Sequence, residues 1–470
     1  MAITRRQFLK RSSAVSAAAL LGPGLFGNPF VRRALADTIG DRYLLVIFLD
    51  GGNDGLNTVV PVNDGGGSLR TSYEAARGTG TGGLRLLPSD LANTLIGTDA
   101  TGAQLALHPG FTGLKQLYDL GQVAVIQGCG YPDYSLSHDE SRHIWMAGDP
   151  NNLSGGANGW VGKHLAANYL GSEIPAVCIS DGVAGELRQN VTSVLAVHRL
   201  RDLGFPYDGA SDADIPAKRA AFAALCASAA GSAQPGLQYI GSNGTATLLA
   251  SESYPALDDL YVNDRSAFND AYDAIDKSSA RDLREVAKMV YGVKTGVPNV
   301  HARFFQLSNG GYDTHSDQGA AATDGQQYGL HQELGDSLKI FFDDLTDMGE
   351  ADKMTVVVWS EFSRRVPQND SGTDHGSQGP VFVIGGGVTG GVYGNHPNID
   401  PAALDDNGNT VYSQAAGAFR STDFRDVYGT ILKHWLNVPE PTILSGILPI
   451  DSGNANTHWT TNDFDLGFFT

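Results

Sequence analysis

Three apolar stretches of this chain each end in carboxylate or imidazole side chains close to glycine. The clusters are residues 50–54 (DGGND) after 43–49, residues 310–315 (GGYDTH) after 304–307, and residues 360–361 (SE) after 354–359, the last followed by residues 373–376 (TDHG). Short apolar runs without alternation predict parallel strands buried on both faces, and ligands bind beyond the carboxyl ends of such strands. If these ends converge, they gather oxygen and nitrogen ligands into a metal-dependent active site.

Six side chains of these clusters are candidate ligands for one or two divalent cations. They are Asp50, Asp313, His315, Glu361, Asp374 and His375. Mixed carboxylate and imidazole ligands suit zinc or manganese, and carboxylates also bind calcium or magnesium. Two alternatives stay open, because DGGND also fits a simple turn and the Asp-x-His motif also fits a solvated loop. Asn53 and Asp54 are candidates for binding the substrate or a second ion.

A nucleophile is predicted at the start of a helix that continues through Trp145. Ser137 lies there, where backbone N–H groups stabilise an alkoxide or a bound anion, and His138 beside it is a candidate substrate-binding residue. Ser137 and Glu140 also form an S-x-x-E capping box, which is the commoner role of such a serine. Arg364, whose guanidinium fork suits a tetrahedral oxyanion, is the second predicted catalytic residue.

Residues 1–36 have the features of a twin-arginine export signal. They contain TRRQFLK at positions 4–10, an apolar stretch and an A-x-A cleavage site at 34–36. We therefore expect a periplasmic or secreted protein whose export partner is the twin-arginine translocase. This segment has six basic residues and no acidic ones, so removing it from 32 basic and 51 acidic residues leaves a net charge of −25. Such a surface disfavours nucleic acids and anionic membranes as partners, and no other apolar run approaches the roughly 20 residues of a membrane helix.

The remaining residues, 37–470, are predicted to form one α/β domain, because the motif clusters are spread over most of the chain. Strand and helix patterns alternate, which predicts a mostly parallel sheet flanked by helices. Residues 326–348 have the clearest helical periodicity, and residues 186–300, rich in alanine, are predicted to form a helical insertion or cap. The three cysteines have no CxxC spacing and are interpreted as core residues.

Five motifs together resemble the bacterial family known as domain of unknown function 1501, which is related to the alkaline phosphatase and sulfatase superfamily. They lie at residues 50–61, 107–110, 137–145, 310–318 and 360–376. The resemblance implies an alkaline phosphatase-like three-layer sandwich in which Asp50 is the first metal ligand, Ser137 the nucleophile, and Asp313 with His315 the second ligand cluster. Either Glu361 replaces the usual strand-end Asp and His375 is the later ligand, or Asp374-His375 is a displaced pair. We prefer the first assignment, because His375 lies just before the next predicted strand.

The hypothesis that follows is an exported metal-dependent hydrolase of phosphate or sulfate esters. Its nucleophile is Ser137 or a metal-activated water, and its substrate is a small-molecule or polysaccharide ester. The C/S-x-P-x-R signature of sulfatases is missing around Ser137, so an identical activity is not implied. The alternative is a non-catalytic periplasmic or cell-surface binding protein that retains the phosphatase-like fold.

Overall fold

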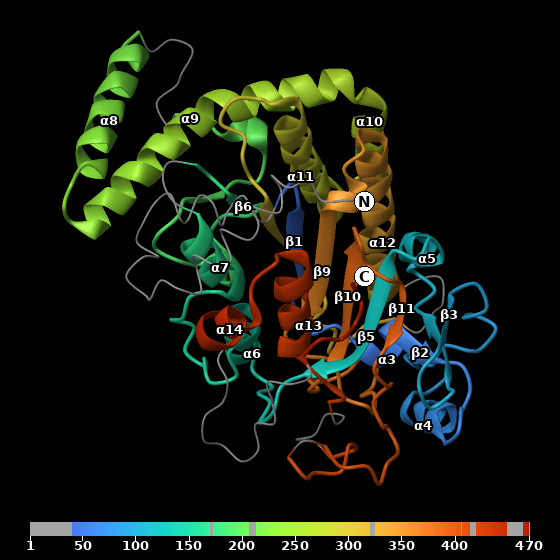
Figure 1. The fold of residues 1–470 in the computed structure, drawn as a ribbon. Helices are drawn as coiled ribbons and strands as arrows, with labels where there is room; N and C mark the ends of the chain where they lie inside the picture. The colour runs from blue at the N-terminus through green and yellow to red at the C-terminus, as the bar shows by residue number, and fades with distance from the viewer. Residues whose placement is uncertain are drawn as a thin grey trace, which may run out of the picture.

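The computed structural model describes residues 40–169, 173–205, 213–319, 325–405, 407–413, 420–448 and 464–469. The predicted export signal, residues 1–36, lies outside this set. Figure 1 shows a central sheet with helices on both sides, which confirms the predicted α/β class. No helix of the described ranges is both long and apolar enough to span a membrane.

The main sheet has the strand order β11-β5-β10-β9-β1-β8-β6-β7, with β12 beside β5. Its strands are β1 (Tyr43–Leu49), β5 (Val123–Gly130), β6 (Ala176–Cys178), β7 (Val194–Ala196), β8 (Phe304–Asn309), β9 (Met354–Ser360), β10 (Gly379–Gly385), β11 (Gly391–Tyr393) and β12 (Thr422–Asp423). Every pairing is parallel except those of β10 with β5 and β9. A mostly parallel sheet was predicted, and it is confirmed. A small separate sheet contains β2 (Val59–Pro61), β3 (Leu95–Thr98) and β4 (Gln104–Leu107).

The central strand β1 is buried on both faces, as its unbroken apolar sequence predicts. Tyr43, Leu45 and Ile47 belong to one hydrophobic core, and Leu44 and Val46 belong to a second core on the opposite face. Because side chains alternate along a strand, one apolar run supplies both cores of a three-layer structure. The three cysteines are buried and unpaired.

Helices cover the two faces of the sheet. One core includes side chains of α5 (Thr112–Asp119), α11 (Ser278–Thr295) and α12 (Gln326–Met348), and the other includes side chains of α6 (His138–Ala147), α7 (Trp160–Asn168) and α13 (Phe424–Thr430). The predicted helix at 326–348 is confirmed as α12. The shorter helices are α3 (Gly55–Thr58), α4 (Leu69–Ala76) and α14 (Glu440–Thr442).

The segment 186–300 is mainly helical, as predicted, but it also contains the edge strand β7. Besides α11 it comprises α8 (Ile215–Ala230), α9 (Pro235–Asp264) and α10 (Ser266–Ile275). Figure 1 places α8 and α9 at the top of the molecule, whereas the arrow of β5 points to the bottom. The carboxyl ends of the parallel strands are therefore at the opposite end from α8 and α9. These two helices do not cap that end.

Candidate metal centre

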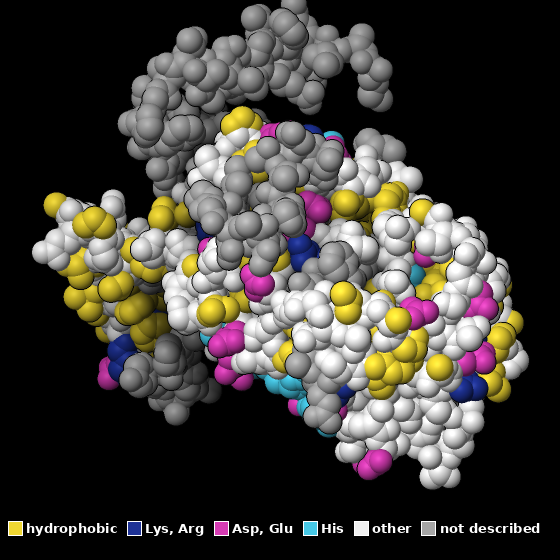
Figure 2. Space-filling model, turned by 90° about the horizontal axis from the view of Figure 1, so that it is seen from below, with side chains coloured by type: hydrophobic (Ala, Val, Ile, Leu, Met, Phe, Trp, Pro, Cys, Tyr) yellow, Lys and Arg dark blue, Asp and Glu magenta, His cyan; other side chains and the backbone are white. Residues whose placement is uncertain are grey.

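The carboxyl ends of β1, β8 and β9 lie at the same level of the sheet. Leu49, the last residue of β1, is opposite Asn309 at the end of β8 and Ser360 at the end of β9. The polar clusters that follow these strands are therefore brought to one edge, as their order in the sequence predicts. Figure 2 looks at the molecule from below and shows histidine side chains gathered at the surface of this end, beside acidic and basic groups.

A tight turn that contains two glycines follows β1 and forms one side of this site. Gly51 and Gly52 have φ of +121° and +83°, and a Cβ at Gly51 would collide with the backbone nitrogen of Asp313. Only glycine fits this close approach without strain. The backbone N–H groups of Gly51 and Gly52 donate to the two carboxylate oxygens of Glu361, at 3.0 and 3.1 Å. The turn thus binds the carboxylate at the end of β9.

Three histidines surround the carboxylate of Asp313. Their Nε2 atoms lie 3.2 Å (His315), 3.5 Å (His375) and 3.6 Å (His138) from an Asp313 carboxylate oxygen. His138 is in the first turn of α6, Asp313 and His315 follow β8, and His375 lies between β9 and β10. Four potential metal donors thus converge from three separate parts of the chain. Of these, His138, Asp313 and His375 have donor atoms that all lie within 4.8 Å of one another.

Each of these imidazoles uses its other nitrogen, Nδ1, to contact a hydrogen-bond acceptor. The Nδ1 partners are Glu361 Oε1 for His138 (2.8 Å), Asp374 Oδ1 for His315 (3.0 Å) and the carbonyl oxygen of Leu136 for His375 (2.7 Å). Because carboxylates and carbonyls only accept, Nδ1 carries the proton in all three rings. In a neutral imidazole the Nε2 atom then presents a lone pair. A carboxylate or carbonyl behind a histidine is the usual support of a metal-ligating imidazole.

The geometry of the two loop histidines fits a cation. His315 Nε2 and His375 Nε2 are 2.9 Å apart. With Nδ1 protonated in both rings, two Nε2 lone pairs face each other at this distance and repel unless a proton or a metal cation lies between them. Three imidazole nitrogens and one carboxylate form a donor set suited to zinc or manganese, whereas calcium and magnesium prefer oxygen ligands.

Local charges tune the protonation of these groups. Burial alone would raise the pKa of Asp313, but the hydrogen bond and charge of Arg364 outweigh it and lower that pKa. The hydrogen bond that His138 donates to Glu361 raises the pKa of His138 despite partial burial. Burial lowers the pKa of His375, which keeps its imidazole neutral over a wider pH range. Asp313 is therefore ionised and His375 neutral near pH 7, the states that metal ligands require.

Asp50, predicted as the first ligand, is placed outside this group of four donors. Its carboxylate accepts a hydrogen bond of 2.9 Å from Nη2 of Arg142. Burial raises the pKa of Asp50, and Arg142 opposes this effect. Glu361 and Asp374, also predicted as ligands, instead hold His138 and His315 from behind. The carboxylate of Glu361, which follows the end of β9, therefore accepts a hydrogen bond from an imidazole and is not one of the four donors.

Arg364 contributes to the structure of the site from a fully buried position. Its guanidinium donates to Asp313 Oδ1 (2.7 Å) and to the carbonyl oxygens of Gly52 (2.7 Å), Thr373 (2.9 Å), Tyr312 (3.0 Å) and Gly51. These bonds tie the glycine turn to the loops that carry Asp313 and His375. Because its side chain is fully buried, Arg364 is placed to hold these loops together rather than to contact a substrate oxyanion, the role predicted for it.

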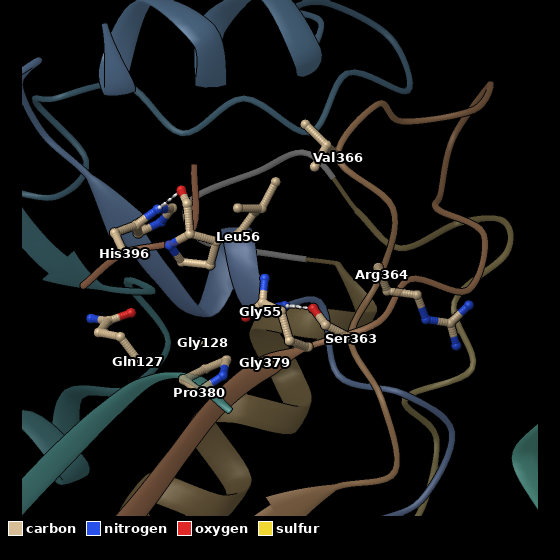
Figure 3. A pocket seen from close by; sticks show the side chains of 12 residues that line it. Gly55, Leu56, Gln127, Gly128, Ser363, Arg364, Val366, Gly379, Pro380 and His396 are labelled. Carbon is tan, nitrogen blue, oxygen red and sulfur yellow. Dashed lines mark hydrogen bonds between the residues drawn. The ribbon is translucent and has the colours of Figure 1, made fainter. Parts of the chain in front are cut away.

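A small pocket lies next to Arg364 but is separate from the four donors. It encloses about 300 Å³, including its opening to solvent, and is lined among others by Gly55, Gln127, Ser363 and His396. Figure 3 shows the Arg364 guanidinium turned away from the other lining side chains, and Ser363 accepting a hydrogen bond from the Gly55 backbone. None of the four donor residues lines this pocket.

Asn53 and Asp54, predicted to contact substrate or a second ion, are both buried and turned inward. Thr58 donates to the side chain of Asn53 (3.0 Å), and the Asp54 carboxylate accepts from Arg77 (2.8 Å) and Gln318 (2.7 Å). The side-chain oxygen of Asn53 and the carboxylate of Asp54 thus have partners inside the protein. We therefore leave them out of the proposed site.

Ser137 is exposed at the N-terminal end of α6, between two residues that contact the donor group. Its side chain makes no capping hydrogen bond, and Glu140 instead accepts from Ser135 at 2.6 Å. The capping box, the alternative interpretation of this serine, is therefore not formed. The preceding residue, Leu136, accepts from His375, and the next residue, His138, is one of the donors.

Two residues of α6, His138 and Arg142, make contacts in the site that the sequence did not predict. His138 was predicted only to bind substrate, and Arg142 was not singled out. They are four residues apart, so they share one face of the helix, and this spacing is the signal that could have identified them. His143, five residues from His138, instead contacts the carbonyl oxygen of Leu153.

One family of known sequences matches part of the chain. Residues 284–415 match the family described as "Protein of unknown function (DUF1501)". A search of curated proteins found no match. The matched residues, 284–415, include Asp313, His315, Glu361 and His375 but no residue of α6.

Two solved structures are similar to the chain at low levels. The lipoteichoic acid synthase LtaP from Listeria monocytogenes is 10% identical, with a TM-score of 0.31, over 83% of this chain and 76% of that one. The PsFucS1 sulfatase from Pseudoalteromonas sp. is 11% identical, with a TM-score of 0.29, over 93% and 73% of the two chains. Similarities of this size have no bearing on the activity of this chain.

Proposed function

We propose that this protein is an exported metal-dependent hydrolase of phosphate or sulfate esters. The observation that supports it most is the convergence of three histidine Nε2 atoms on Asp313, with every Nδ1 held by an acceptor. Acceptors that hold Nδ1 in this way orient the imidazoles of metal centres. Export rests on residues 1–36 and is tested by fractionating cells that express the full chain.

In this proposal His138, Asp313, His315 and His375 hold one zinc or manganese ion. When bound, the cation supplies positive charge that stabilises the developing negative charge on the ester oxygens. Glu361 and Asp374 fix the orientation of His138 and His315, and Arg364 holds Asp313 in place. The glycine turn keeps Glu361 fixed from below.

Ser137 is the proposed nucleophile. Its hydroxyl is exposed at the start of α6, where the helix dipole favours a developing negative charge. A water molecule is the alternative nucleophile. Loss of hydrolysis in Ser137→Ala, with unchanged metal content, would favour the serine.

The proposal is tested by removing one donor and measuring both metal and turnover. We expect His375→Ala to lose bound metal and to reduce hydrolysis of chromogenic phosphate and sulfate esters by more than ~100-fold, because a direct ligand is lost. A chelator should have the same effect on the unmodified protein. His198→Ala is the matched control, since His198 is an exposed histidine that also contacts an aspartate, Asp181, at 2.8 Å.

Two results would count against the hydrolase. Bound metal with no turnover of any ester would favour the non-catalytic binding protein. Equal metal content in His375→Ala and His198→Ala would show that the donor group does not hold the cation.

A further inference from the structure

The arginines of the site differ in how much of their guanidinium is free to meet a ligand. Arg364 is fully buried and its donors bind carbonyls and Asp313. Arg365 is mostly buried, donates to the carbonyl of Ser413 (2.7 Å) and lies 3.6 Å from Asp374. The side chain of Arg142, by contrast, is 30% exposed and makes one hydrogen bond, to Asp50.

Arg142 also lies near His138, and contacts with neighbouring side chains fix its orientation. It lies one helical turn after His138 on α6, and its guanidinium carbon is 5.4 Å from the ring centre of Phe48. The contact with Phe48 and the bond to Asp50 fix one edge of the planar group. Its second terminal nitrogen has no protein partner within the described part of the chain. An arginine with one edge fixed and one edge open is suited to an anionic oxygen.

The charges around the donor group nearly cancel. The carboxylates of Asp50, Asp313 and Asp374 form ion pairs with Arg142, Arg364 and Arg365, and the carboxylate of Glu361 contacts His138. Four negative and three positive groups leave one net negative charge. Histidines bind metals as neutral groups, so a divalent cation brings the site to one net positive charge. Asp139 and Glu140 in the first turn of α6 are exposed, so water screens their charges, and the charges of Glu186 and Arg188, which also interact, cancel each other.

A site with one net positive charge favours a ligand with one negative charge. Attraction to the site rises in proportion to the charge of the ligand, whereas the cost of removing the ligand from water rises with the square of that charge. A monoanion leaves the site neutral. A dianion leaves it negative after a much larger desolvation cost.

We infer that the site takes singly charged tetrahedral esters, which are sulfate monoesters or phosphate diesters, in preference to dianionic phosphate monoesters, and that Arg142 binds the charged group. This inference rests on the proposed function and narrows its substrate class. Sulfate monoesters and phosphate diesters share the single charge that the site selects. Comparing the turnover of a sulfate monoester with that of a phosphate diester shows which of these two classes the protein hydrolyses.

The test compares the binding of three small anions to the metal-loaded protein by calorimetry at pH 8. Methyl sulfate and dimethyl phosphate are monoanions, and methyl phosphate is a dianion at this pH. We expect both monoanions to bind about tenfold more tightly than methyl phosphate. Asp50→Asn adds one positive charge while keeping an acceptor for Arg142. It should shift the ratio of the two affinities about tenfold toward methyl phosphate.

Arg142→Gln should weaken the binding of all three anions about tenfold or more while leaving the metal affinity unchanged. Arg281→Gln is the matched control, because Arg281 is an exposed, ion-paired arginine of α11, which is outside the site. The inference alone would be overturned if methyl phosphate bound as tightly as the two monoanions or more tightly. It would also be overturned if Asp50→Asn left the ratio of the affinities unchanged. A chain that binds no divalent cation, or none of the three anions, would overturn the inference and the proposed function together.

Discussion

Two glutamates of this protein are completely buried, and their surroundings are opposite. Glu361, at the end of β9, accepts hydrogen bonds from Gly51, Gly52, Ser360 and His138. Glu186 is in a short 3-10 helix, Gly185–Leu187, that contacts α6 and α7. Apart from its own backbone N–H, no donor satisfies either of its carboxylate oxygens.

The two carboxyl groups differ in the number of hydrogen-bond donors that they meet. Four donors stabilise a carboxylate at Glu361, although the group is removed from water. At Glu186, burial raises the pKa to about 7, and the charges of Arg142 and Arg188 only partly oppose this. Burial by itself therefore does not determine what a carboxyl group does. Glu361 is met by several donors, whereas Glu186 lacks them and its pKa rises to about 7.

Glu361→Gln should have the largest effect, because it breaks the donor-rich arrangement. A glutamine places an NH₂ group against the N–H of Gly51 or Gly52, so a buried donor loses its acceptor. We expect a loss of about 3 kcal/mol in unfolding free energy and a 10–100-fold loss of metal affinity, because His138 loses its charged partner. Chemical denaturation and a chelator competition assay measure the two effects. Wild-type metal affinity in this variant would contradict the role assigned to Glu361.

Glu186→Gln should have the opposite sign and a marked pH dependence. The folded-state pKa of Glu186, about 7, lies above the ordinary value of 4.5. The stabilisation from holding its proton is therefore complete below about pH 4.5 and is lost as the pH rises through 7. The ionised form then costs up to about 3 kcal/mol at pH 8.

Glutamine has no charge to bury, so this variant should be more stable than the unmodified chain at pH 8 and about equal to it at pH 4. Unfolding curves at the two pH values measure the difference. A constant difference between pH 4 and pH 8 would show that Glu186 does not titrate in this range.

Asp374→Ala should have the smallest effect and sharpens the comparison. Asp374 contacts Nδ1 of His315 as Glu361 contacts His138, but its side chain is 46% exposed. Water can replace the lost acceptor, so we expect about tenfold weaker metal binding and little change in stability. The chelator competition assay used for Glu361→Gln applies here as well. If Asp374→Ala lost more metal affinity than Glu361→Gln, a buried carboxylate would not support its histidine better than an exposed one.

The sequence predicted those parts of the molecule that depend on local patterns. The apolar run of β1, the periodicity of α12 and the convergence of Asp313, His315 and His375 all follow from residues near one another in the chain and from the rule that parallel strands end at one edge. The edge strand β7, only three residues long, was missed because so short a segment has no recognisable pattern.

The remaining parts of the site depend on contacts between distant residues. Glu361 is held by a turn about 310 positions earlier in the chain, and this contact makes it a partner of His138. Asp50 is turned to Arg142, 92 positions later, rather than to the donor group. Such assignments need the packing of α6 against the strand ends, which spacing along the chain does not reveal.

Titration of the metal-free protein with zinc or manganese tests the central claim most directly. The arrangement of His138, Asp313, His315 and His375 predicts one tightly bound cation per chain, and its loss when His315 and His375 are both replaced by alanine. A chain that binds neither metal, or a double variant that binds the metal as tightly as the unmodified protein, would contradict this assignment of the four donors.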